Sequence, residues 1–194
     1  MSQLKIVGFA GSSSQPSRTR NLVEAVAHAA AARTGAATEI YDLTEIHPSL
    51  GATLDPRQAP ADLVALIETI STADALIVGS PVYKGTYTGL FKHLFDLIEP
   101  KALKDKPVAL TATGGSERHA LVLDHGLRPL FAFFSADILA TGLYATEADF
   151  TDYRPSSPTL LSRIDRTVEE LTWRLLATRP ESLPQRAAET LLTA

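Results

Sequence analysis

The chain has 194 residues, of which 45% are hydrophobic and 21% are charged, and its net charge is −4 at pH 7. These values fit one globular domain with a sizeable core. The mild negative charge argues against nucleic-acid binding, and no run of about 18 apolar residues could span a membrane. Cysteine is absent, which excludes disulfides and cysteine nucleophiles. Because the first residues run directly into a strand-like segment instead of a signal peptide, we expect a cytoplasmic protein.

Short apolar runs alternate with longer segments of helical spacing. The runs cover residues 4–10, 38–43, 75–80, 108–113 and 138–144. Several are almost continuously hydrophobic, which is typical of parallel strands buried on both faces. The alternation predicts a doubly wound α/β protein. With five strands, a flavodoxin-like parallel sheet of order 2-1-3-4-5, with helices on both faces, is favoured over the six-stranded dinucleotide fold.

Apolar residues at spacings of three and four predict the helices between these strands. They are expected around residues 22–30, 63–70, 90–98, 117–135 and 158–175. On the last helix, Trp173 is expected in the core, and the predicted inner face consists of Leu161, Ile164, Val168, Leu171 and Leu175. Residues 47–60 and 147–158 are expected to be surface loops. We expect one domain over residues 1–179 and a C-terminal tail over residues 180–194.

A polar loop follows the first predicted strand. Residues 11–19 read Gly-Ser-Ser-Ser-Gln-Pro-Ser-Arg-Thr and lead into a helix, whose free N–H groups and dipole favour an anion. Hydroxyl groups and Arg18 supply donors for phosphate oxygens. The glycine pattern of a dinucleotide site and the Gly-Lys-Ser/Thr of a P-loop are both missing, so a monophosphate is expected. A helix N-cap in a flexible polar loop is the alternative.

Two more loops follow the third and fourth predicted strands at the same sheet edge, where ligands of open α/β folds bind. Residues 80–87 read Ser-Pro-Val-Tyr-Lys-Gly-Thr-Tyr, and residues 113–116 read Thr-Gly-Gly-Ser. Gly114 and Gly115 are expected to let the backbone approach a flat ligand and present N–H groups to it. Tyr83 is expected to form a wall beside the ring. Together with the phosphate loop, these segments predict a site for a flavin mononucleotide.

These three segments resemble the NAD(P)H-dependent FMN reductase family, and within it the reductases of two-component alkanesulfonate and methanesulfonate monooxygenases. The resemblance extends from residue 4 to about residue 176 and implies hydride transfer from NADH or NADPH to FMN. The reduced product, FMNH2, would then serve a separate FMNH2-dependent monooxygenase of the sulfonate type.

The resemblance also implies site residues. The FMN phosphate is assigned to Ser12, Ser17, Arg18 and Thr19. The ring is assigned to Pro81, Val82, Tyr83 and Lys84 on one side and to Thr113, Gly114, Gly115 and Ser116 on the other. One departure is Ser13-Ser14, where the alkanesulfonate branch tends to carry Pro-Arg. Arg18 is therefore the only arginine of this loop.

A proline interrupts the fourth predicted helix. Pro129 removes a hydrogen bond and collides with the carbonyl of His125, a defect that helices absorb as a kink or a π-bulge. The resemblance implies an inserted aromatic-ring residue here, forming a π-helix at a subunit interface, and histidine resembles the methanesulfonate branch. We expect His125 to be this π-bulge residue and to control flavin exchange. A plain kinked helix is the alternative.

No protein acid or base is expected to be catalytic, because the two cofactor rings carry the hydride chemistry. No histidine has metal-ligand spacing, so no metal site is expected. Two other functions stay open: a flavodoxin-like electron carrier with permanently bound FMN, and a quinone or azo reductase on the same scaffold.

The third and fourth predicted helices carry more apolar side chains than one side of a sheet needs, which predicts a homodimer or homotetramer. These side chains are Leu90, Phe91, Leu94, Phe95, Leu130, Phe131, Phe133 and Phe134.

Overall fold

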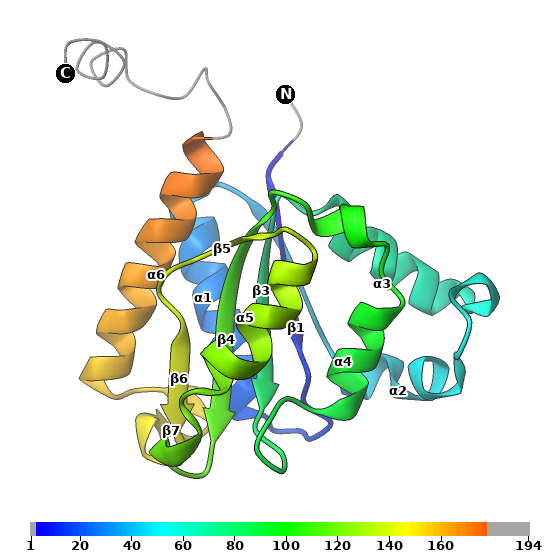
Figure 1. Cartoon of the computed structure of the whole chain (residues 1–194). Helices are drawn as coiled ribbons and strands as arrows, with labels where there is room; N and C mark the ends of the chain where they lie inside the picture. Colours follow the sequence, from blue (N-terminus) through cyan, green and yellow to red (C-terminus); the bar gives the residue numbers. More distant parts are fainter. Residues whose placement is uncertain (1–2, 178–194) are drawn as a thin grey trace.

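A parallel sheet forms the centre of the molecule in the computed structural model, which describes residues 3–177 (Figure 1). Its strands are β1 (Lys5–Ala10), β2 (Ala37–Asp42), β3 (Ala75–Pro81), β4 (Pro107–Gly114), β5 (Asp137–Ile138) and β6 (Leu143–Thr146). The order is β2-β1-β3-β4-β5, with β6 also paired to β4, and every pair is parallel. The predicted flavodoxin-like order 2-1-3-4-5 is confirmed.

The last predicted strand is discontinuous. β5 pairs with the first residues of β4 and β6 with its last residues, so the continuous strand expected over residues 138–144 is wrong in its middle. There, the backbone N–H groups of Ala140 and Thr141 donate to the carboxylate of Glu170, at 2.8 and 3.1 Å, instead of to the sheet. At this point the side chain of Glu170, from the last helix, accepts the hydrogen bonds in place of a neighbouring strand.

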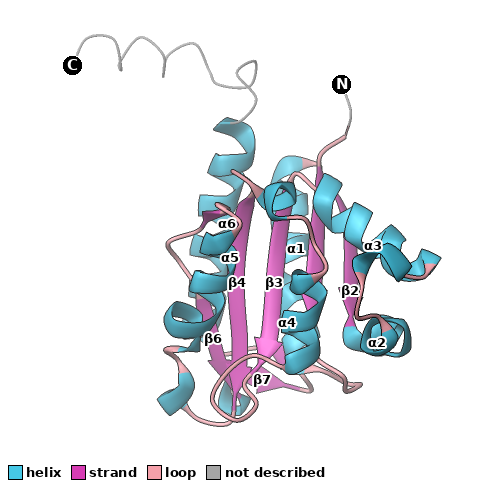
Figure 2. Cartoon of the chain, turned by 45° about the vertical axis from the view of Figure 1, so that its right-hand side comes forward, coloured by secondary structure: helices cyan, strands magenta, loops and turns pink. Residues whose placement is uncertain are grey.

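Helices cover both faces of the sheet (Figure 2). On one face lie α1 (Arg18–Thr34) and α6 (Pro158–Ala177); on the other lie α2 (Leu43–Ala52), α3 (Ala61–Thr72), α4 (Gly89–Asp96) and α5 (Arg128–Phe133). Alternate residues of each strand serve the two cores, since side chains alternate across a strand. In β1, for example, Val7 and Phe9 face α2–α5, whereas Ile6 faces α1 and α6.

Two expected loops contain secondary structure. The stretch 47–60 includes the second half of α2 and a 3-10 turn over Pro56–Gln58. Its proline and glycine content favours a loop, but Asp42 and Glu45 form a capping box that starts the helix. The stretch 147–158 contains a 3-10 turn (Glu147–Asp149) and a hairpin of β7 (Phe150–Thr151) and β8 (Arg154–Pro155).

Helix α6 buries four of the five residues of its predicted inner face, namely Ile164, Val168, Leu171 and Leu175. Leu160 is buried, whereas Leu161 is 46% exposed, so the predicted inner face is wrong at that position. Trp173 is 63% exposed and its predicted core position is wrong as well. The tail expected over residues 180–194 lies outside the described residues.

The apolar surplus on the third and fourth predicted helices belongs to the protein's own core. Phe91, Phe95 and Phe131 are fully buried and their rings pack with centroids 4.8 to 6.5 Å apart. Phe133 is the exception, at 70% exposed. The argument for an oligomer from this set of residues therefore fails, apart from Phe133. Among the described helices, none has the length and apolar composition needed to cross a bilayer.

The neighbouring leucines of α6 allow a matched test of this packing. We expect Leu160→Ala to lower the free energy of unfolding by about 2–4 kcal/mol, because it leaves a cavity against the sheet. Leu161→Ala should change it by less than about 0.5 kcal/mol, because the side chain lies at the surface. Urea denaturation of both variants checks this, and equal losses would contradict the observed burial of Leu160 and exposure of Leu161.

Candidate functional site

Three loops meet at the carboxyl edge of the sheet, those after β1, β3 and β4. The hydroxyl groups of Thr19 and Thr113 share a buried hydrogen bond of 2.6 Å, which joins the first loop to the third. The backbone N–H of Gly11 donates to Gly79 at 2.7 Å, and that of Val82 to the carbonyl of Thr113 at 2.8 Å. These bonds hold the three predicted segments together as one site.

The loops line a cavity of about 430 Å³, within the usual range of ligand sites. Of the twelve residues assigned from the sequence, ten line it: Ser12, Ser17, Arg18, Thr19, Pro81, Val82, Tyr83, Thr113, Gly114 and Gly115. Lys84 and Ser116 do not. Sequence reasoning missed Thr146, Glu147 and Tyr153, which also line the cavity. Thr146 ends β6 and the other two follow it, and a signal was available, because the loop after any parallel strand reaches this same edge.

The first loop ends as a capped helix. The Oγ of Ser17 accepts the backbone N–H of Arg20 at 3.2 Å, making Ser17 the N-cap of α1. The N–H groups of Arg18 and Thr19 lie in the first turn, where no intrahelical acceptor is available. The loop therefore does contain a helix N-cap, as the alternative interpretation held. This is compatible with anion binding, because the cap leaves N–H donors of the first turn directed toward the cavity edge. The phosphate role of these residues stays a prediction.

Arg20 anchors the first loop from behind, a role that sequence reasoning missed. Its guanidinium pairs with the fully buried carboxylate of Asp42 at 2.8 Å and with Glu45 at 2.6 Å. Burial alone would lower the pKa of Arg20, but its hydrogen bonds to Glu45, Asp42 and Glu24 raise it. The start of α2 is thereby fixed against α1, and the N–H of Leu43 donates to the carbonyl of Ser12 at 3.2 Å. The loop has little freedom at this end.

The structure explains the two glycines of the third loop, Gly114 and Gly115, in different ways. A Cβ on Gly114 would lie 2.0 Å from the hydroxyl of Tyr144, which donates to the carbonyl of Ser116 at 2.6 Å. Burial and nearby Glu117 raise the pKa of Tyr144, which keeps this donor protonated. Gly114 therefore makes room for Tyr144, whereas a Cβ on Gly115 would meet no atom within 4 Å. Close approach of a ligand stays a prediction for Gly115.

The second loop is a tight turn. Tyr83 and Thr86 exchange backbone hydrogen bonds of 2.9 and 3.3 Å, and the residues between them, Lys84 and Gly85, have φ of 53° and 92°. Left-handed conformations at both central positions define a type I′ turn, which strains a lysine. The turn leaves Tyr83 half exposed at the cavity, and Lys84 does not line the cavity.

Comparison with known proteins identifies the family. Residues 4–151 match the family described as NADPH-dependent FMN reductase. The chain belongs to this family. It is 51% identical to "FMN reductase (NADPH)" of Pseudomonas aeruginosa, over 87% of this chain and 90% of that protein. It is 50% identical to "NADH-dependent FMN reductase SfnF" of Pseudomonas fluorescens, over 86% and 89%.

Solved structures agree with this. The apo form of an NADH:FMN oxidoreductase, EmoB, superposes with a TM-score of 0.82 at 27% identity, covering 99% of this chain and 100% of that one. An oxidoreductase from Corynebacterium diphtheriae superposes with a TM-score of 0.78 at 34% identity, covering 90% and 98%.

The donors at the strand ends fit the cofactor of an FMN reductase. Arg18 and the first-turn N–H groups of α1 suit a phosphate dianion. The Nε of Arg18 is buried and has no hydrogen-bond partner among the described residues, so the guanidinium has unused donor capacity. The open space over Gly115 leaves room for a flat ring.

A π-helical segment lies between β4 and α5. The helix predicted over residues 117–135 consists of a 3-10 turn (Glu117–His119), a π-helical segment (Leu123–Leu127) and α5. His125 lies in the π-helical segment, so a π-helix is present where it was predicted, and control of flavin exchange by His125 stays a prediction. Pro129 falls in the first turn of α5, directly after the π-helical segment. The wider turn before it accommodates the proline.

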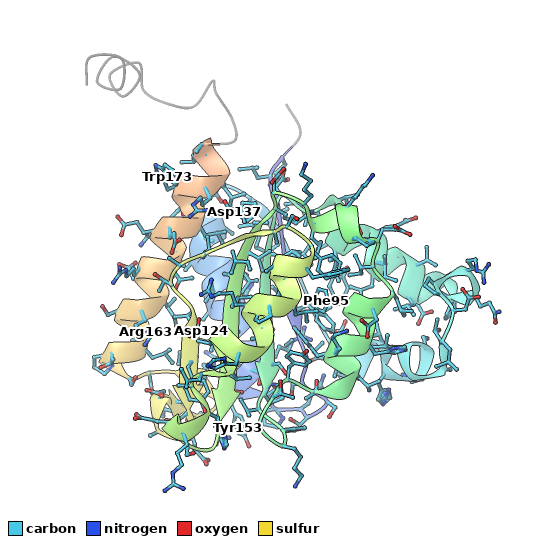
Figure 3. All side chains as sticks on the ribbon, viewed as in Figure 1. Phe95, Asp124, Asp137, Tyr153, Arg163 and Trp173 are labelled. Atoms are coloured by element: carbon cyan, nitrogen blue, oxygen red, sulfur yellow. The ribbon has the colours of Figure 1, made fainter. Side chains whose placement is uncertain are left out.

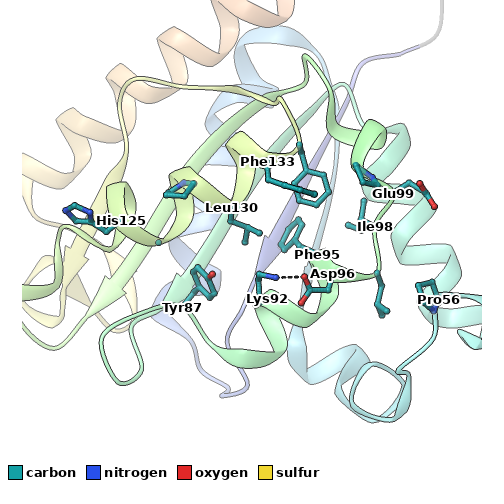
Figure 4. Close-up of a pocket in the computed structure, with 15 residues that line it drawn as sticks. Pro56, Tyr87, Lys92, Phe95, Asp96, Ile98, Glu99, His125, Leu130 and Phe133 are labelled. Carbon is teal, nitrogen blue, oxygen red and sulfur yellow. Dashed lines mark hydrogen bonds and ion pairs between the residues drawn. The ribbon is translucent and has the colours of Figure 1, made fainter.

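A second and larger cavity, of about 660 Å³, lies between α4 and α5 and is bordered by His125 (Figure 4). Its charged groups include Lys92 and Asp96, which pair with each other, and much of the remaining lining is apolar, with Phe95, Leu130 and Phe133. It lacks the convergent donors of the strand-end cavity. The strand-end cavity is therefore the candidate flavin site, although it is the smaller one.

Deletion of His125 tests the π-helix. Because a π-helical turn contains one extra residue, the deletion should convert it to ordinary α-helix and leave the melting temperature close to that of the wild type. We also expect the variant to retain FMN, giving a yellow protein that turns over free FMN poorly. The visible spectrum, a melting curve and NADH oxidation with added FMN measure this.

The matched control is deletion of His28, which is exposed in regular helix α1. There, a deletion rotates the following residues by about 100° and should destabilise the domain. A colourless, stable His125-deleted variant with unchanged turnover would make His125 incidental.

Proposed function

We propose that this chain is an NAD(P)H-dependent FMN reductase in which FMN behaves as a substrate and leaves between turnovers. Bound flavin would supply the hydride-accepting ring, and the protein supplies binding and orientation. The observation that carries the proposal is the cavity at the strand ends, lined by ten residues assigned to flavin, in a member of this family. Relatives bear names with NADPH and with NADH, so either nicotinamide is proposed.

The residues have separate roles. Ser12, Ser17, Arg18 and Thr19 bind the phosphate, and the hydrogen bond between Thr19 and Thr113 aligns this end with the ring end. Pro81, Val82 and Tyr83 lie along one side of the ring, and Thr113, Gly114 and Gly115 along the other. Lys84 and Ser116, which do not line the cavity, keep their assignment through the resemblance alone.

The proposed physiological role follows from the same resemblance. FMNH2 is supplied to a partner monooxygenase in sulfonate or organosulfur utilisation, and the protein acts in the cytoplasm. The two other functions are an electron carrier with permanent FMN and a quinone or azo reductase, and acceptor choice separates them from the main proposal.

Steady-state oxidation of NADH and NADPH tests the proposed activity, with free FMN in one assay and a quinone in the other. We expect oxidation to depend on free FMN, because the flavin exchanges between turnovers. Activity with the quinone alone would favour a quinone reductase. Flavin that copurifies and never exchanges would favour an electron carrier.

The assignment of the phosphate is tested by Arg18→Ala in the same assays. A charge-assisted hydrogen bond contributes roughly 1.5–3 kcal/mol, so the Kd for FMN should rise about tenfold to hundredfold while riboflavin binding is preserved. Arg33→Ala, at the other end of α1, is the control. Equal weakening of both flavins would remove Arg18 from the phosphate site.

We also propose a homodimer or homotetramer, supported by Phe133, which is 70% exposed beside the apolar cavity between α4 and α5. An exposed aromatic next to an apolar groove favours association. Phe133→Ala should shift the mass measured by light scattering toward the monomer, whereas Leu161→Ala on the opposite layer should not. A monomeric wild type at micromolar concentration would contradict this proposal.

A further inference from the structure

Arg18, the residue assigned to the FMN phosphate, is already engaged by another anion. Its Nη2 forms an ion pair with the carboxylate of Glu147, the first residue after β6. Its guanidinium carbon lies 4.8 Å from the centre of the Tyr153 ring. All three side chains line the strand-end cavity, and the ion pair joins one wall of that cavity to the other. We call these three residues the Arg18 clasp.

The segment that carries Glu147 and Tyr153 is held in a defined conformation. The carboxylate of Asp149 accepts the N–H of Thr146 at 2.8 Å and the hydroxyl of Ser157 at 2.7 Å. Asp149 thus connects the end of β6, just before Glu147, to the residue that precedes α6.

The hairpin of β7 and β8 then positions Tyr153. Asp152 and Tyr153, at its tip, have φ of 48° and 64°, the left-handed conformations of a type I′ turn. The side-chain amide of Asn21, on α1, donates to the carbonyl of Tyr153 at 2.8 Å. Figure 3 shows Tyr153 at the carboxyl ends of the strands. The hairpin is thus fastened to the same helix that carries Arg18, which supports a built arrangement.

The ion pair uses only part of the arginine. Glu147 contacts an outer nitrogen, whereas the Nε of Arg18 is buried without a hydrogen-bond partner among the described residues. The side chain of Glu147 is 77% exposed and that of Arg18 is 32% exposed. The carboxylate is therefore free to move into solvent, while the guanidinium stays at the cavity. A dianion bound beside Arg18 would repel Glu147 at this short range.

We propose that Glu147 is a specificity and exchange residue, a tethered carboxylate that occupies Arg18 when the phosphate subsite is empty and competes with the phosphate of FMN. This inference rests on the proposed function. Competition raises the Kd for FMN and speeds its release, as a flavin that leaves at each turnover requires. Riboflavin has no phosphate and does not compete for Arg18, so Glu147 affects FMN selectively.

Glu147→Gln tests this, because the amide keeps the size of the side chain and removes its charge. We expect the Kd for FMN, from flavin fluorescence quenching, to fall about two- to fivefold, the range of a partly exposed ion pair. The FMN release rate in stopped flow should slow correspondingly, and the difference from wild type should shrink at high salt, because screening weakens exposed pairs. Riboflavin binding should not change. Asp152→Asn removes the same charge from the neighbouring hairpin tip, outside the ion pair of Arg18 with Glu147, and should leave FMN binding unchanged.

Each outcome separates the two levels of the proposal. A wild type that binds no FMN overturns the proposed function and, with it, this inference. A wild type that binds FMN, with an unchanged Kd and release rate in Glu147→Gln, overturns the inference alone. Equal tightening by Asp152→Asn, or equal tightening of riboflavin, also overturns it, because either result would show a general charge effect.

Discussion

Parallel pairing of β1, β3 and β4 is the constraint on which the site depends. The register sets Ala10 beside Gly79 and Ser80 beside Ala112, so the three strands end at nearly the same height. Loops from distant parts of the sequence then share one edge, and the hydroxyl groups of Thr19 and Thr113 meet at 2.6 Å. β6 pairs with the last residues of β4 and delivers Glu147 and Tyr153 to the same place. In an antiparallel sheet, half of these loops would lie at the opposite end.

The arginines near this edge of the sheet differ in whether they are available to bind and release a ligand. Two arginines two residues apart on α1 have different partners. Arg20 is held by Asp42, whose side chain is fully buried, and by Glu45 and Glu24, so it supports the structure and is not available to a ligand. Arg18 has one exposed carboxylate partner and an unused buried nitrogen, which suits a side chain that changes partners. A substrate flavin needs this second kind of contact, since a fully satisfied arginine could not respond to its phosphate.

The π-helical segment shows how a local defect is accommodated. In a continuous α-helix over residues 117–135, Pro129 would remove a hydrogen bond and crowd the preceding turn. In the structure the helix is π-helical as far as Leu127 and then continues as α5, with the proline in its first turn. His125 is left exposed at the border of the cavity between α4 and α5. A segment with fewer regular hydrogen bonds is easier to rearrange, and here it adjoins the surface proposed for association.

The sequence by itself determined the strand order, the three loops at the carboxyl edge and the interruption at Pro129, because each depends on local composition and on the periodicity of buried strands. Only the tertiary structure decided which contacts those residues make. Leu160 and not Leu161 faces the sheet, because a helix's orientation depends on the surface it packs against. Gly114 is required by Tyr144 from a neighbouring strand. Glu147 and Tyr153 reach Arg18 from more than a hundred residues away in the chain. These residues are far apart in the sequence, and no periodic pattern relates them. Their contacts can therefore be recognised only in the structure, where the sheet brings the loops together.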